Sequence, residues 1–208
     1  VHVIHTGQSV GVGANISVAQ INSQVAALNR DYRRLPDDAG IALGAGVDTE
    51  IQFCLKGINR VNGSSVSGYS SSGITSSNEV SVKALSLWDN CCYYNIWTVT
   101  EINGNNGGAG TQGYAYFPNS CNFNKDKDGT VVLYNAFGND PGGGNGYNLK
   151  NYTRLGRVMT HEIGHGLDLY HTFNGGSCTE TTCATQGDRC CDTPPHPGNN
   201  TNCGTPEC

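Results

Sequence analysis

One eleven-residue segment, HEIGHGLDLYH (161–171), places three histidines and a glutamate at fixed spacings. His161 and His165 are four residues apart, so on a helix both imidazoles lie on one face and can reach one metal ion. A straight helix would carry His171 too far away, because each residue adds about 1.5 Å of rise. His171 can join the pair only if the helix ends near Asp168 and the chain turns sharply. The segment therefore predicts a helix that ends abruptly at a metal site.

The turn is expected at Asp168. Sharp helix ends usually use glycine, because other residues tolerate a positive φ angle poorly. Aspartate and asparagine are accepted substitutes, since their short side chains hydrogen-bond locally. On a continued helix the aspartate would lie about 10 Å along the axis from His161, which a short side chain cannot bridge. We therefore predict that Asp168 is a turn residue and not a metal ligand.

Glu162 directly follows the first histidine of the segment. From there its carboxylate can reach the open coordination position and take a proton from a water at the metal. Histidine nitrogens are typical zinc ligands, and zinc lowers the pKa of its water to about 7. We predict zinc ligation by His161, His165 and His171, with Glu162 as general base. The alternative is two helix histidines without a metal, and the third histidine makes it less favoured.

Ten cysteines occur among the 208 residues, and the last six fall within 31 residues. That segment is rich in Gly, Pro, Thr and Asn and lacks periodic hydrophobicity. A thiolate zinc site would need paired CxxC motifs, and the sequence has none. This favours a disulfide framework, which is typical of a secreted, extracellular protein.

The net charge of −5 and the absence of a basic stripe argue against a nucleic-acid partner. No apolar run approaches the roughly 18 residues of a membrane span, so a membrane partner is not expected either. Hydrophobic residues make up 37% of the chain, which is too many for a disordered protein.

Hydrophobic periodicity predicts strands and helices in mixed order. Ser17 and Gln20 form a capping box at the start of the first helix. Helices are expected at 15–35, 82–88 and from about Tyr152 into the histidine segment, strands at 1–5, 48–55, 94–100, 113–118 and 129–137, and loops at 62–78, 103–110 and 138–148. This is an α+β arrangement with an α/β-like upper part, in which helices back a twisted sheet.

The segment HEIGHGLDLYHTF resembles the long zinc motif of the metzincin endopeptidases, H-E-x-x-H-x-x-G-x-x-H, with Asp168 at the glycine position. Other stretches resemble the pappalysin branch of that group, in the family's order along nearly the whole chain. These stretches are VHVIHTG, QINSQVAALNRDYRR, TEIQFCL, NIWTV, GYAYFP, VVLYNAFG and GDRCCDTPP.

The resemblance implies a metzincin-type twisted mixed sheet with a backing helix and a zinc-binding active-site helix. These elements would form an upper catalytic subdomain at 1–171, followed by a small, irregular, disulfide-rich lower subdomain at 172–208. It implies a secreted, zymogen-derived endopeptidase that uses zinc-activated water. Family members also have a methionine-containing turn downstream of the third histidine, whereas the sole methionine here is Met159. We therefore expect the sequence to be clipped before that turn.

Two further sites are expected. The stretch GDRCCDTPP brings together Asp188, Asp192 and the Thr193 carbonyl, and hard oxygen ligands suit Ca²⁺. The matching loop of the family binds calcium, and the alternative is an Asp-rich turn held by disulfides. A protein or peptide substrate is expected to pair with an edge strand. The residues of that strand are Gly113, Tyr114, Ala115 and Tyr116.

A second function remains open, that of a catalytically impaired binding module that keeps the metal as a structural element. Asp168 and the missing methionine turn favour this alternative, and the intact Glu162 opposes it.

Overall fold

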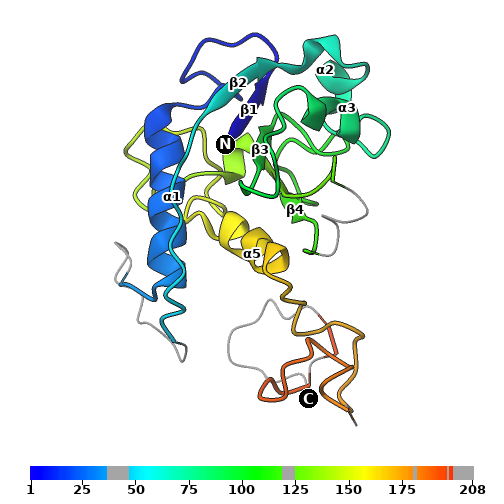
Figure 1. The fold of residues 1–208 in the computed structure, drawn as a ribbon. Helices are drawn as coiled ribbons and strands as arrows, with labels where there is room; N and C mark the ends of the chain where they lie inside the picture. The colour runs from blue at the N-terminus through cyan, green and yellow to red at the C-terminus, as the bar shows by residue number, and fades with distance from the viewer. Residues whose placement is uncertain (37–46, 119–124, 180–181, 196, 199–208) are drawn as a thin grey trace. The chain divides into compact units, whose positions relative to one another are not determined.

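The structure is a computed structural model that describes residues 1–36, 47–118, 125–179, 182–195 and 197–198 (Figure 1). The chain divides into two compact units, Val1–Gly166 and Leu167–Cys208, which we call the sheet unit and the Cys-rich unit. The boundary between them falls inside the histidine segment. Among the described residues, no helix has the length and apolar character needed to cross a membrane.

A five-stranded mixed sheet forms the centre of the sheet unit. Its strands are β1 (His2–His5), β2 (Asn59–Asn62), β3 (Ile96–Val99), β4 (Gly113–Ala115) and β5 (Thr130–Leu133), in the order β2-β1-β3-β5-β4. All neighbours run parallel except β4, which is antiparallel to β5 and forms an edge of the sheet. The predicted α+β class with a mixed sheet is confirmed.

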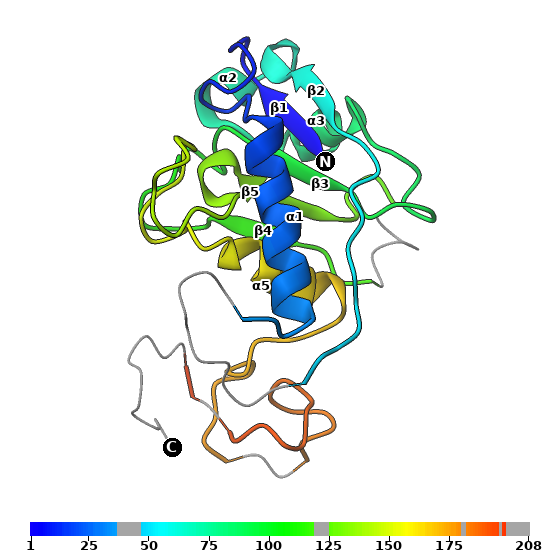
Figure 2. The same cartoon turned by 90° about the vertical axis from the view of Figure 1, so that its left-hand side faces the viewer.

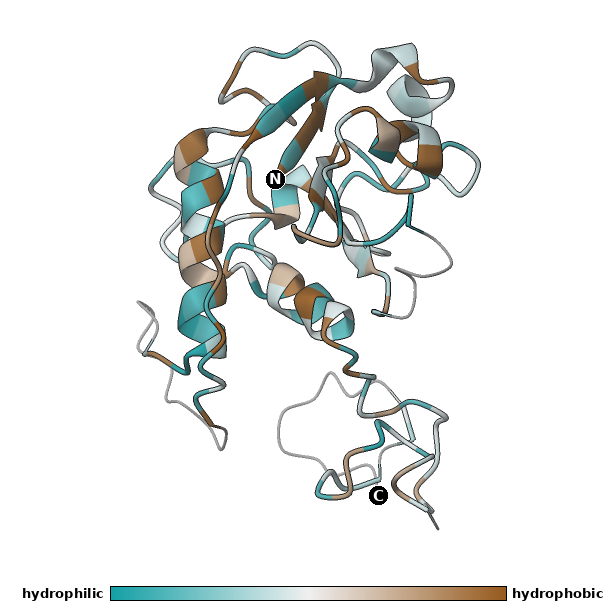
Figure 3. Ribbon diagram, in the orientation of Figure 1, coloured by the Kyte–Doolittle hydropathy of each residue, from teal (hydrophilic) through white to brown (hydrophobic). Residues whose placement is uncertain are grey.

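Helix α1 (Val18–Tyr32) lies across one face of this sheet (Figure 2). The side chain of Ser17 accepts a hydrogen bond from the Gln20 amide at 3.1 Å, which confirms the predicted cap. The buried side of α1 includes Ile21 and Leu28, and Figure 3 shows hydrophobic and hydrophilic residues alternating around the helix. The 3.6-residue period of the sequence therefore places an apolar stripe against the sheet.

The strand predicted at 48–55 is wrong. Ile51 and Phe53 do pack against the core, so the alternation that suggested a strand is real. The backbone of this segment, however, pairs with a side chain of α1. The Asn29 amide donates to the Phe53 carbonyl at 3.0 Å, and its oxygen accepts from the Phe53 amide at 2.6 Å. The Asn29 side chain thus forms the backbone hydrogen bonds that a neighbouring strand would otherwise form. The strand that does join the sheet, β2, begins at Asn59.

The region between β2 and β3 is more regular than the predicted loop at 62–78. It contains a 3₁₀ turn at Gly63–Ser65, the short helix α2 (Tyr69–Ser72) and helix α3 (Glu79–Ala84). Helix α3 starts three residues before the predicted 82–88. A second 3₁₀ turn, Tyr134–Ala136, follows β5 within the stretch predicted as one strand.

Helix α5 (Arg157–Gly166) carries the first part of the histidine segment. It begins later than the predicted start near Tyr152, because Gly156 has a φ angle of 73° and interrupts helical geometry. A β-carbon at Gly156 would lie 2.9 Å from Nε2 of the Gln24 side chain. Helix α1 therefore lies close to the backbone at Gly156. Met159 and Ile163 are buried in the core, which leaves the opposite side of α5 for other uses.

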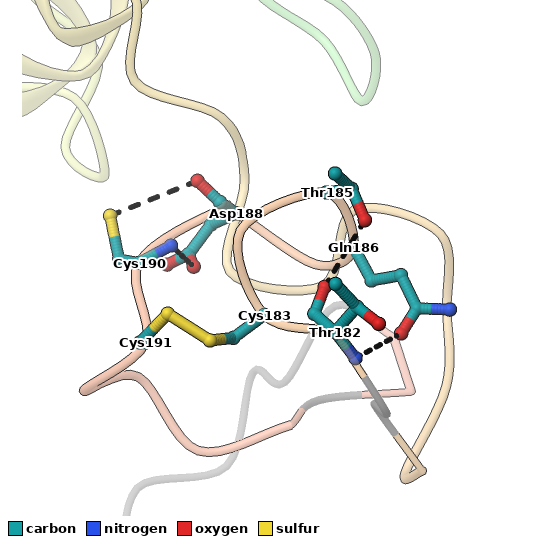
Figure 4. Close-up of a disulfide and its surroundings, with 7 residues drawn as sticks. All are labelled: Thr182, Cys183, Thr185, Gln186, Asp188, Cys190 and Cys191. Atoms are coloured by element: carbon teal, nitrogen blue, oxygen red, sulfur yellow. Dashed lines mark hydrogen bonds between the residues drawn. A yellow bond between two sulfur atoms is a disulfide. The ribbon is translucent and has the colours of Figure 1, made fainter.

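The Cys-rich unit has no helix or strand among its described residues. A disulfide joins Cys183 and Cys191, whose Cα atoms are 5.0 Å apart (Figure 4), and Cys178 is also disulfide-bonded. The Arg189 guanidinium lies 4.4 Å from the centre of the Tyr170 ring, a cation–π contact within the unit. The predicted disulfide-bonded character of the tail is confirmed at these cysteines, but Cys190 in the same unit is a free thiol. Cys54, Cys91 and Cys92 of the sheet unit are also free, so the predicted framework does not extend to them. Cys121, Cys203 and Cys208 lie outside the described residues.

Candidate metal centre

Two histidines converge on one side of α5. The Nε2 atoms of His161 and His165 are 3.1 Å apart, and their rings stand edge to face with centroids 4.7 Å apart. Two nitrogens at 2.0–2.1 Å from one tetrahedral zinc ion would lie roughly 3.3 Å apart. The observed separation fits a shared zinc ion, as the i, i+4 spacing predicts.

The surroundings of the pair fix the last turn of α5. A β-carbon at Gly166 would lie 2.1 Å from the Tyr94 hydroxyl, so any larger residue here would displace the Tyr94 ring. The Tyr94 hydroxyl in turn forms a 2.8 Å hydrogen bond with the Thr130 hydroxyl at the start of β5. The Phe117 ring lies 5.5 Å from the His165 ring. These contacts hold the helix end, and with it the His165 ring, against the sheet.

Glu162 lies on the more buried side of the same turn, and only 7% of its surface is exposed. Burial raises the pKa of its carboxyl group from 4.5 to about 7. A β-carbon at Gly113 would lie 3.0 Å from Glu162 Cγ and 3.3 Å from Oε1. The glutamate therefore packs directly against the start of β4, where the absence of a side chain gives it room.

The edge strand β4 presents one side of its backbone away from the sheet. The Leu133 amide donates to the Gln112 carbonyl, and the Tyr116 amide donates to the Gly129 carbonyl, at 2.9 and 3.2 Å. Backbone groups alternate in direction along an antiparallel strand, so those of Gly113 and Ala115 point away from β5. No described strand pairs with β4 on that side.

Asp168 has a φ angle of 72°, and α5 ends two residues before it. The predicted left-handed turn at this aspartate is therefore confirmed. His171 lies in the Cys-rich unit, where its ring stacks on Phe173 with centroids 4.7 Å apart. Its role as the third ligand stays a prediction.

The expected calcium ligands lie in a loop beside the Cys183–Cys191 disulfide. Asp188 Oδ1 accepts a hydrogen bond from the Cys190 amide at 2.9 Å (Figure 4), and the Thr193 amide donates to the Cys190 carbonyl at 3.1 Å. These are local turn contacts of the kind aspartate makes without a metal. The assignment of Asp188, Asp192 and Thr193 to calcium stays a prediction.

Sequence reasoning missed three residues near the site. Tyr94 supports α5, and no spacing in the sequence connects it to the histidine segment. Glu79 and Lys83 hold Tyr114 of β4 and Tyr116 just past its end, as described below. Their i, i+4 spacing was a visible signal of an ion pair, but such pairs ordinarily lie on exposed helix faces.

A helix with the HExxH pattern, placed against the antiparallel edge strand of a mixed sheet, is the arrangement of the metzincin class of metallopeptidases. A model of the Peptidase M43 family, described as pregnancy-associated plasma protein-A, matches residues 74–208. The chain belongs to this family, which confirms the resemblance to pappalysins.

Curated relatives agree with this family. The chain is 29% identical over 207 residues to an extracellular metalloprotease of Sordaria macrospora, covering 98% of this chain and 58% of that protein. It is 31% identical over 195 residues to an extracellular metalloprotease of Pyricularia oryzae, covering 93% and 54%. The chain thus spans between half and three fifths of the length of these relatives.

Solved structures show the same fold. Mature mirolysin of Tannerella forsythia, in complex with a cleaved peptide, matches with a TM-score of 0.70 and 29% identity, covering 96% of this chain and 71% of that chain. Mirolysin in complex with a small compound matches with a TM-score of 0.69 over the same shares of both chains.

Proposed function

We propose that this chain is the catalytic part of a secreted zinc endopeptidase that cleaves protein or peptide substrates. The observation that carries the proposal is the arrangement on α5, where two histidine nitrogens 3.1 Å apart flank a buried glutamate. Membership of a metallopeptidase family supports it, as does the name of the fungal relatives, extracellular metalloproteases.

His161, His165 and His171 would hold the zinc ion. His171 comes five positions after Gly166, and such a short connection keeps the third histidine within roughly 17 Å of the helix end. Asp168, with a φ angle of 72°, adopts a left-handed conformation within this connection, as a sharp helix end requires. Both features support the return of His171 toward the helix pair.

Zinc, when bound, supplies a Lewis acid that polarises the scissile carbonyl and acidifies water. Glu162 then takes the proton of the attacking water and delivers it to the leaving amine. Burial raises the pKa of Glu162 to about 7 in the metal-free protein, and the positive charge of zinc would lower it.

A peptide substrate would lie extended along β4. The outward backbone groups of Gly113 and Ala115 can form main-chain hydrogen bonds with it, as an added strand does. Pairing at Gly113 would also bring the peptide next to Glu162, which packs against that glycine. The side chains of Tyr114 and Tyr116 lie on the face of the sheet opposite to that of Gly113 and Ala115, and both hydroxyls bond Glu79 there.

The function can be tested with purified protein and an internally quenched peptide about ten residues long. Glu162→Gln should lower kcat by roughly a hundredfold to ten-thousandfold while zinc content stays near one ion per chain. Glu101→Gln, the same change away from α5, should leave both unchanged. A wild-type protein that binds zinc and peptide but hydrolyses nothing would establish the binding-module alternative instead.

Calcium binding by Asp188, Asp192 and the Thr193 carbonyl is part of the proposal. Removing a ligand that binds only the folded state lowers stability by mass action. A calcium-selective chelator should therefore lower the melting temperature and make the Cys-rich unit susceptible to proteolysis. An unchanged melting curve after verified calcium removal would reject this site.

A further inference from the structure

Helix α3 carries a buried ion pair. Glu79 and Lys83 are one helical turn apart and have exposed fractions of only 4% and 0%. The Lys83 ammonium lies 2.9 Å from Glu79 Oε1 and donates a second hydrogen bond to the Lys127 carbonyl at 2.5 Å. A charged pair this deeply buried loses its hydration, so its geometry must be well satisfied to be tolerated.

Besides Lys127, whose ammonium lies 3.6 Å from Glu79 Oε2, two partners of this pair come from β4 and the residue just past it. The Tyr114 hydroxyl donates to Glu79 Oε1 at 2.9 Å, and the hydroxyl of Tyr116, just past the end of β4, donates to Oε2 at 2.8 Å. Each oxygen of one carboxylate thus holds one tyrosine. The Lys83 ammonium also lies 5.6 and 4.7 Å from the centres of these two rings, within the range of cation–π attraction.

Burial and charge act against each other in this network. Burial alone would raise the pKa of Glu79, but the Lys83 charge and the two tyrosine hydroxyls bring it below its ordinary value. Burial lowers the pKa of Lys83, and Glu79 opposes that shift. A buried ion pair often stabilises a fold no better than apolar residues of similar size would. Unlike apolar residues, this pair also fixes the positions of two hydroxyl groups, because Glu79 accepts a hydrogen bond from each of the two tyrosines.

Strand β4 has few contacts of its own that would hold it in place, so the hydrogen bonds of its tyrosine side matter. It is three residues long, and among the described strands it pairs with β5 alone. The residues that alternate with the two tyrosines are Gly113 and Ala115, whose backbone groups form the outward edge. Gly113 also makes the close contact with Glu162. A shift of the tyrosines would therefore move the peptide-binding edge, whereas Glu162 itself is held on α5.

We propose that Glu79, held by Lys83, is a positioning residue that fixes β4 through Tyr114 and Tyr116 in the place where it pairs with a peptide. Glu79 acts through the tyrosines and does not touch the substrate. The inference rests on the proposed function, because it assigns peptide pairing to β4.

The test compares two phenylalanine variants of the full-length, zinc-loaded protein. Tyr114→Phe combined with Tyr116→Phe removes both hydroxyls and leaves the Glu79–Lys83 pair in place. Tyr69→Phe is the matched control, because its buried hydroxyl donates to the Ile4 carbonyl at 2.8 Å, on β1 and away from β4. Steady-state kinetics on the ten-residue peptide and amide hydrogen exchange of 113–116 are measured for each.

We expect the double variant to raise KM roughly tenfold with kcat within about twofold of wild type, because lost hydrogen bonds to a charged group loosen the peptide-binding edge. Amide exchange at 113–116 should become faster in this variant alone. Tyr69→Phe should lower the melting temperature without changing KM. A double variant that behaves like Tyr69→Phe, or one that loses kcat with KM unchanged, would overturn the inference.

The proposed function and the positioning role fail in different ways. If the wild-type protein hydrolyses no peptide, the proposed function fails, and peptide affinity measured by fluorescence anisotropy replaces KM. A double variant that binds the peptide as tightly as wild type, with unchanged exchange at 113–116, then overturns the positioning role as well. Weaker binding with faster exchange supports the positioning role without catalysis.

Discussion

The sheet unit and the Cys-rich unit keep their structures by different means. In the sheet unit, apolar residues from the strands, α1 and α5 form one buried core. The described part of the Cys-rich unit has no helix or strand, and a disulfide with local turn hydrogen bonds holds its loops. A segment of about 40 residues buries too little apolar surface to fold on a core alone, so covalent links take over that role.

This difference bears on the proposed metal centre, because the histidine segment crosses the boundary. His161, Glu162 and His165 belong to the unit with the core, and His171 belongs to the unit with the disulfides. Changes that weaken one unit should therefore leave part of the zinc motif in place. The following predictions test whether the two units can be destabilised independently, and they run from the largest expected effect to the smallest.

Glu79→Gln should destabilise the sheet unit by about 3–5 kcal/mol, because it leaves the Lys83 charge buried without its counter-ion. Urea unfolding monitored by tryptophan fluorescence measures this loss, since Trp88 and Trp97 both lie in the sheet unit. Glu79→Gln combined with Lys83→Met removes both charges and should recover most of the stability. A loss below about 1 kcal/mol in the single variant would contradict the importance of the pair.

Acid should weaken the sheet unit through His2. Burial lowers the pKa of this histidine from 6.5 to about 4, and its Nε2 lies 2.8 Å from the Asn95 side-chain oxygen. Below pH 6.5 the unfolded chain takes up a proton that the folded chain does not, so stability falls as the pH drops toward 4. The loss should be on the order of 3 kcal/mol. It is measured as the difference in pH dependence between wild type and His2→Gln, and parallel curves would refute it.

Replacing Cys183 and Cys191 by serine should affect the Cys-rich unit alone. The disulfide closes a short loop, and its removal costs about 2–3 kcal/mol in the chain-entropy description. Limited proteolysis should then cut within 167–208, while the urea midpoint of the sheet unit stays the same. A lower midpoint for the sheet unit would show that the two units unfold together.

Asp168→Gly should have the smallest effect, a gain of about 1 kcal/mol or less, because glycine adopts a positive φ without strain. Zinc content and peptide hydrolysis should be retained. Asp168→Val should be clearly worse, since a β-branched residue fits this conformation poorly. If Asp168→Gly loses zinc, the aspartate is a ligand and the assignment of His171 is wrong.

Local signals predicted much of the sheet unit. The Ser17 cap, the apolar stripe of α1 and the β-branched runs of β3 and β5 depend on neighbouring residues, so a single sequence reveals them. The left-handed turn at Asp168 was predicted from helix geometry and confirmed. The existence of a mixed sheet could be predicted, but the order of its strands could not.

The features that the sequence did not predict share a physical cause: each depends on contacts between residues far apart in the chain. Phe53 alternates as a strand residue does, but its backbone partner is the Asn29 side chain of α1. Glu79 and Lys83 look like an exposed helix pair until tertiary packing covers them. The late start of α5 depends on Gly156, where α1 approaches closely. For the Cys-rich unit, composition predicted cross-links but not which cysteines pair.

The edge of β4 that no described strand covers has a consequence for the behaviour of the protein at high concentration. An edge that can accept a peptide can also accept the edge of another copy, which is a common route to aggregation. At three residues, β4 offers few backbone hydrogen bonds, so pairing between copies should be weak. The same shortness limits the affinity that a peptide gains from main-chain pairing. Selectivity among peptides must then come from side-chain contacts elsewhere along the bound chain.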